Sequence, residues 1–170
     1  MNKGVENQKN YPLNKKVREY FWGGWCMQAL WNYERQMNTA FMWGMSKTID
    51  RLYPEPEDDP KRKEAYKRHL EFFNITPQFG AFVLGLSAAM EEEYAENPDT
   101  FDPKIINSVK VALMGPLSGI GDSFFQGTVR VIAMSVGISL AQQGSILGPI
   151  IAMLISFAVS FPITWFGGKL

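Results

Sequence analysis

The C-terminal quarter of the chain is apolar and uncharged. From Val131 to Gly168 there is no Asp, Glu, Lys, Arg or His. Within this stretch, residues 145–166 read SILGPIIAMLISFAVSFPITWF. At about 1.5 Å per residue, a helix of this length is roughly 33 Å long, close to a hydrocarbon core of about 30 Å. The pattern predicts a membrane-spanning helix, and the alternative is the buried core helix of a soluble protein.

The N-terminal half alternates polar and apolar positions at the spacing of amphipathic helices. Residues 15–51 are predicted to be helical, with a possible break at Gly23-Gly24. Four tryptophans add bulk to this segment: Trp22, Trp25, Trp31 and Trp43. Aromatic-rich amphipathic helices lie in the membrane interface or pack under a partner. An ordinary core-facing stripe is the alternative.

Proline and small residues delimit the elements that follow. Residues 53–60 (YPEPEDDP) predict a loop, and Asp59-Pro60 predicts a helix start that continues to about Phe73. Residues 78–97 predict the next helix. Its face of Ala81, Gly85, Ala88 and Ala89 permits close approach of another helix.

Glycine and proline then interrupt the pattern before the uncharged region. Residues 105–114 predict a short apolar helix, which is followed by Gly115, Pro116, Gly119 and Gly121. These residues disfavour a regular helix, whereas Asp122 is a favoured N-cap. We therefore expect a discontinuous helix pair around residues 114–122. Broken helices of this kind hold polar substrates inside transporters.

Taken in order, the elements predict an all-α integral membrane protein with at least one full transmembrane helix. We expect a flexible N-terminal arm (residues 1–16) and an amphipathic or interfacial helical region (17–104). A membrane-embedded region (105–170) follows, which we expect to be the start of a longer one.

Composition excludes several classes of site. The formal net charge is zero, so no general attraction to nucleic acid follows. The single cysteine, Cys26, excludes an intrachain disulfide and a Cys-rich zinc site, and the single histidine, His69, disfavours a His-based metal site. The glycine stretch lacks the Gly-Lys-Ser/Thr of a phosphate-binding loop. We expect no metal and no cofactor.

Asp122, Gln126 and Arg130 are the first candidates for substrate binding. They are four residues apart in turn, so on a helix they share one face. A carboxylate, an amide and a guanidinium in a row can hydrogen-bond several hydroxyls of a sugar. The alternative is structural, with Asp122 capping a helix and Arg130 anchoring it at an interface.

Asn32, Glu34 and Arg35 form the second candidate group, in one turn of the aromatic segment. They can contact substrate or a partner subunit, or only pair with one another on a polar face. His69 is more simply a surface or packing residue than a phosphate carrier, because no acidic or glycine-rich setting surrounds it in the sequence.

Three long motifs occur together and in order. They are WNYERQMN (residues 31–38), RHLEFFN ending at Pro77 (68–77), and MGPLSGIGDS with QGTVR (114–130), continued by GSILGP (144–149). From about residue 17 to its end, the chain resembles the IID membrane component of the bacterial mannose/fructose/sorbose-type sugar phosphotransferase permeases.

The resemblance implies partners and a location. It implies a IIC membrane subunit, cytosolic IIA and IIB phosphocarriers, a sugar substrate, surrounding lipid and oligomers of IIC–IID pairs. It also implies a multi-pass protein of the bacterial cytoplasmic membrane. The phosphohistidines belong to the partners, so no catalytic residue is expected in this chain. Family members are longer, so we expect the N-terminal portion of a IID subunit.

The function expected from this resemblance is transport. With IIC, the chain would form the channel that translocates a hexose or an amino sugar, coupled to its phosphorylation. The alternative is a membrane docking or receptor protein without transport activity of its own. A soluble helical enzyme is a third hypothesis, which the uncharged run from Val131 argues against.

Overall fold

The computed structural model describes residues 3–169, and these residues form helices connected by turns and loops. The all-α prediction is confirmed. Five helices build an N-terminal bundle: α1 (Lys3–Asn10), α2 (Leu13–Trp25), α3 (Asn38–Leu52), α4 (Asp59–His69) and α5 (Gly80–Glu96). Short 3₁₀ turns, η1 (Pro56–Asp58) and η2 (Pro77–Phe79), precede α4 and α5.

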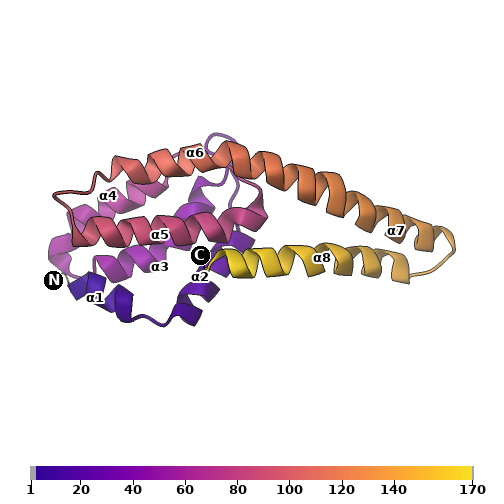
Figure 1. Ribbon diagram of the computed structural model, residues 1–170, viewed down its shortest axis with the longest axis horizontal. Helices are drawn as coiled ribbons and strands as arrows, with labels where there is room; N and C mark the ends of the chain where they lie inside the picture. Colours follow the sequence, from indigo (N-terminus) through magenta and orange to yellow (C-terminus); the bar gives the residue numbers. More distant parts are fainter. Residues whose placement is uncertain (1–2, 170) are drawn as a thin grey trace.

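The remaining helices leave this bundle and return to it (Figure 1). Helix α6 (Lys104–Gly121), the π-helical segment η3 (Asp122–Val129) and α7 (Arg130–Gln142) follow one another without a gap. A turn at Gly144, which has a positive φ of 77°, leads into α8 (Leu147–Gly167). Helices α7 and α8 form a hairpin that extends away from the bundle, and the end of α8 comes back beside it (Figure 1).

The core of the bundle is apolar and aromatic. Phe41, Met45, Ile49 and Leu52 of α3 are fully buried at the spacing of one helical face. Helix α5 packs closely on α2, where a Cβ added at Gly24 would lie 2.6 Å from the backbone nitrogen of Ala81. The small face predicted for residues 78–97 therefore does receive another helix.

The helix predicted over residues 15–51, with a possible break at Gly23-Gly24, is wrong in its middle, and the break lies after Trp25. Helix α2 runs through Gly23-Gly24 and ends at Trp25, and residues 26–37 form turns before α3 begins. Gln36 has a positive φ of 58°, and the backbone N–H of Met37 donates to the carbonyl of Phe73 at 2.8 Å. A left-handed backbone conformation at Gln36 and a backbone hydrogen bond from Met37 to another segment are incompatible with a helix here.

The N-terminal arm expected to be flexible contains helix α1. Val5 and Gln8 of this helix are fully buried, and the Gln8 side-chain amide donates to Glu92 at 2.7 Å. These anchors tie α1 to the bundle. The first two residues of the predicted arm, and the last residue of the predicted membrane-embedded region, lie outside the described residues.

The predicted break at Gly115, Pro116, Gly119 and Gly121 is also wrong. All four residues lie inside α6, which passes through Pro116 without interruption. Proline and glycine penalties of about 3 and 1 kcal/mol apply to helices in water. In an apolar environment a helix is the backbone state that satisfies its own polar groups, so it tolerates such residues. The irregularity instead falls just after them, in η3.

Two helical stretches are long and apolar enough to cross a membrane: residues 104–142, which comprise α6, η3 and α7, and residues 147–167 of α8. Only 22% and 11% of their most apolar windows are buried. A core helix of a soluble protein would be mostly buried, so this exposure favours an apolar solvent or a partner around them.

Candidate functional site

A cleft opens where η3 faces two loops of the bundle. It encloses about 500 Å³. The loop after α2, the segment before α5 and the α6–η3 junction each supply one wall. The lining residues are Gln28, Trp31, Gln36, Met37, Asn74, Ile75, Thr76, Pro77, Ser118, Asp122 and Gln126. Six of these are hydroxyl or amide residues, and Asp122 adds a carboxylate.

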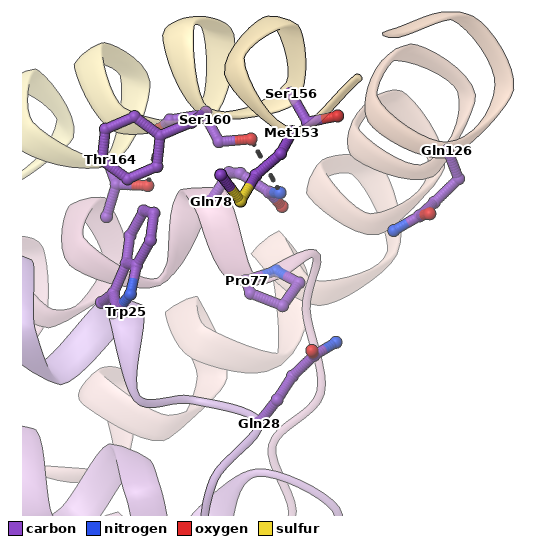
Figure 2. A pocket seen from close by; sticks show the side chains of 11 residues that line it. Trp25, Gln28, Pro77, Gln78, Gln126, Met153, Ser156, Ser160 and Thr164 are labelled. Carbon is purple, nitrogen blue, oxygen red and sulfur yellow. Dashed lines mark hydrogen bonds between the residues drawn. The ribbon is translucent and has the colours of Figure 1, made fainter. Parts of the chain in front are cut away.

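An adjoining cleft of about 390 Å³ continues toward α8. The two share Gln28, Pro77 and Gln126, so they are parts of one space that we call the central cleft. In Figure 2, Gln126 faces Pro77 and Gln28 across the opening, while Ser156 and Ser160 project from α8. The other residues of this part are Gly24, Trp25, Gln78, Met153, Phe157 and Thr164.

Asp122 is the charged residue of the central cleft. It is exposed at the start of η3, and its Oδ1 accepts a hydrogen bond of 2.8 Å from the hydroxyl of Thr76. Of the described residues that line the cleft, none is Lys, Arg or His. The lining therefore suits a neutral ligand rich in hydroxyl groups better than an anion.

Gln126 and Arg130 continue the row from Asp122, as predicted from their spacing. The guanidinium of Arg130 donates to Gln126 Oε1 at 2.8 Å, and both side chains are exposed. Arg130 itself lies outside the central cleft, at an apolar groove between α7 and α8. The structure therefore brings Asp122 and Gln126 to the cleft and leaves Arg130 as a neighbour that orients Gln126.

The α8 wall contributes hydroxyl groups. The side-chain amide of Gln78 donates to Ser160 Oγ at 3.4 Å, and Thr164 Oγ1 donates to the carbonyl of Ser160 at 3.0 Å. Trp25 and Phe157 flank them, with ring centroids 5.6 Å apart. Amides and hydroxyls beside aromatic rings are the combination that recognises both the polar edge and the apolar face of a sugar.

Asn32, Glu34 and Arg35 do not line the central cleft. The Asn32 side chain accepts from the backbone N–H of Arg35 at 2.8 Å and donates to Asn38 Oδ1 at 2.7 Å. Arg35 donates to the carbonyl of Leu70 at 3.4 Å, and Glu34 is exposed. These contacts shape the turn that presents Trp31 and Gln36 to the cleft.

The buried polar cluster of the bundle holds His69. Its Nε2 lies 2.9 Å from Oε1 of Glu91, and Arg68 binds both oxygens of the same carboxylate at 2.8 and 2.9 Å. Burial lowers the pKa of His69 to about 4. Although burial opposes ionisation of Glu91, hydrogen bonds from His69 and Arg68 lower its pKa. A neutral histidine with no exposed surface is a packing residue, as the sequence analysis favoured.

Sequence reasoning missed most of the cleft. Thr76 and Pro77 lie at the end of the second motif, so the sequence could have indicated them. Gln28, Gln78 and Ser160 lie outside the motifs, and no sequence pattern indicates them. They meet because α2, η2 and α8 pack together, which residue spacing along the chain cannot reveal.

Comparison with known proteins identifies the family. The sequence model of the "PTS system mannose/fructose/sorbose family IID component" matches residues 13–170. The mannose-specific EIID component of Escherichia coli K12 is 40% identical over 151 residues, which are 89% of this chain and 52% of that protein. The sorbose-specific EIID component of Klebsiella pneumoniae is 44% identical over 143 residues, covering 84% of this chain and 51% of that protein.

A solved structure agrees with these matches. One chain of the cryoEM structure of the mannose transporter ManYZ with microcin E492 is 40% identical, with a TM-score of 0.83. The match covers 91% of this chain and 55% of that one. The chain thus spans about half the length of the relatives it matches. Matches in sequence and in structure confirm the resemblance, and the chain belongs to the mannose/fructose/sorbose IID family of phosphotransferase-system membrane components.

Proposed function

We propose that this chain, as part of a full-length IID subunit, forms with a IIC subunit the path of a hexose or amino sugar. Cytosolic IIA and IIB carriers would phosphorylate the sugar as it enters. The observation that carries this proposal is the central cleft, which has hydroxyl and amide walls and a single carboxylate beside two membrane-length helices.

Recognition in this cleft would work by hydrogen bonding and stacking. The carboxylate of Asp122 accepts from sugar hydroxyls, while the amides of Gln126 and Gln78 donate and accept. Trp25 and Pro77 offer apolar surface to the sugar ring. The absence of Lys, Arg and His among the described lining residues favours the neutral sugar over its phosphate. This suits a site that holds the sugar before phosphorylation.

Asn32, Glu34 and Arg35 would support this site indirectly in the proposal. Their turn carries Trp31 and Gln36 to the cleft, so a partner subunit that contacts the exposed Glu34 side would also fix those residues. Residues 17–104 would then serve as the interfacial support, and residues 105–170 as the start of the membrane-embedded region.

The exposed apolar face of α7 supports the location and assembly we propose. Its members are Val131, Ile132, Met134, Val136 and Ile138. Lipid of the bacterial cytoplasmic membrane and the IIC subunit would cover this face, in a multi-pass protein built from IIC–IID pairs.

The test removes the carboxylate from the cleft. Asp122→Ala in the full-length subunit, expressed with its IIC, should lower sugar uptake by about 10- to 100-fold, because a charged hydrogen bond contributes about 1.5–3 kcal/mol. Mannose, sorbose and fructose serve as probes, and membrane levels of the subunit are measured in parallel. The matched control is Asp99→Ala, an exposed aspartate in the turn before α6. Normal uptake by the Asp122 variant would reject the site.

A further inference from the structure

Thr76 makes a hydrogen bond to Asp122, the carboxylate of the proposed sugar site. Thr76 is only 2% exposed, although it lies at the end of a loop. The hydroxyl oxygen is 2.8 Å from Asp122 Oδ1 and 3.3 Å from the carbonyl oxygen of Ser118. A hydroxyl has one proton to donate, and the charged, closer acceptor is the stronger one. The proton therefore goes to the carboxylate.

The backbone beside Thr76 has no spare room. A Cβ added at Gly121 would lie 2.5 Å from the Cβ of Thr76, a separation that side chains do not tolerate. Glycine at this position lets α6 approach the segment before α5 closely enough for the Thr76 hydroxyl to reach the next residue, Asp122. Gly119 and Gly115, two and six residues earlier in α6, have open space around them.

The contact falls where the helix changes type. Residues 122–129 form the π-helical segment η3, and the N–H of Arg130 donates to the carbonyl of Phe125, five residues back. Phe125 is buried and its ring meets that of Phe79 edge to face at 5.9 Å. Residues 76–79 thus hold η3 at its first residue and again in its middle. Segments of π-helix in α-helices are frequent at functional sites.

We propose that Thr76 is a positioning residue for sugar binding, whose buried hydroxyl fixes the Asp122 carboxylate at the start of η3. This inference rests on the proposed function. With Oδ1 held by Thr76, Oδ2 is left to accept a hydroxyl of the sugar. The same contact sets the start of η3, and so places Gln126 on the wall of the cleft that faces Pro77.

The test compares two substitutions of nearly equal size in the full-length IID–IIC complex. Thr76→Val keeps the shape and removes the hydroxyl, whereas Thr76→Ser keeps the hydroxyl. We expect Thr76→Val to raise the Kd of the purified complex for its transported sugar, chosen among mannose, sorbose and fructose, by about tenfold. Thr76→Ser should stay within about threefold of wild type. In uptake, KM should rise and Vmax should hold.

A double substitution distinguishes the positioning role of Thr76 from the proposed sugar site at Asp122. If Thr76 acts through Asp122, Thr76→Val should have no further effect on Kd in an Asp122→Ala background. An equal loss in both backgrounds, or an unchanged Kd in Thr76→Val alone, overturns the positioning role. Normal binding by Asp122→Ala alone instead overturns the proposed sugar site. If Asp122→Ala raises the Kd and Thr76→Val does not, the proposed sugar site is supported and only the role of Thr76 is rejected.

Discussion

At the residue scale, polar groups in this chain divide into those that build the bundle and those that face the cleft. Inside the bundle, Arg68 and His69 both bind the carboxylate of Glu91. Asp122 and Gln126 each have one bonded partner, Thr76 and Arg130, and remain exposed to the cleft. Burial and pairing therefore explain why the chain's lone histidine is structural, whereas the exposed Asp122 carboxylate remains available to a ligand.

The buried histidine makes stability depend on pH. Burial lowers the pKa of His69 to about 4, whereas an unfolded histidine has a pKa of about 6.5. Between pH 6.5 and pH 4 this histidine is protonated in the unfolded chain but neutral in the folded chain. The free energy of unfolding therefore falls as the pH drops. The loss should reach about 2–3 kcal/mol at pH 4 relative to pH 7.

The variant that isolates this effect is His69→Gln, whose amide can still donate to Glu91. Melting temperatures of the detergent-purified protein are compared between pH 7 and pH 4.5. The wild type should lose more stability on acidification than His69→Gln, and an identical loss would assign the effect to Glu91 and other carboxylates.

Sequence reasoning at the residue scale found the row of Asp122, Gln126 and Arg130 because four-residue spacing is read directly from the chain. It also named Asn32, Glu34 and Arg35, which do not line the central cleft, because Asn32 bonds Asn38 and Arg35 bonds Leu70. Such partners depend on how the loop folds back, which no local pattern encodes.

At the element scale, strong periodic or uncharged stretches were predicted well and irregular ones were not. Helix α5 and the membrane-length α8 follow the sequence pattern within a few residues. The predicted helix break was wrong because it relied on the low helix propensities of glycine and proline measured in water. A helix in apolar surroundings persists despite these residues, since it must satisfy its own backbone polar groups. The π-helical form of η3 has no sequence signature at all.

Two glycines of α6 give a matched test of this account. Gly119→Ala enters open space and should stabilise an unbroken helix by about 0.5–1 kcal/mol. Gly121→Ala meets the Thr76 side chain and should destabilise the protein by about 1–3 kcal/mol. Thermal unfolding in detergent measures both. Destabilisation by Gly119→Ala would indicate a backbone there that is not helical.

At the scale of the whole molecule, the membrane-length helices are joined to the bundle through aromatic contacts. Phe21 of α2 meets Phe161 and Trp165 of α8 at ring-centroid distances of 5.1 and 5.3 Å. The far end of the α7–α8 hairpin is held by small residues, since a Cβ added at Gly137 would lie 2.9 Å from that of Ala152. This arrangement fixes α8 across from η3, and the central cleft lies between them.

The position of a bound sugar decides whether the central cleft is the sugar site. We expect a cryoEM structure of the full-length IID–IIC complex, prepared with the sugar that it transports, to place density between Gln28, Pro77 and Gln126. A sugar hydroxyl should lie within about 3 Å of the Asp122 carboxylate. Sugar density elsewhere, with lipid or a partner side chain filling the central cleft, would contradict the account.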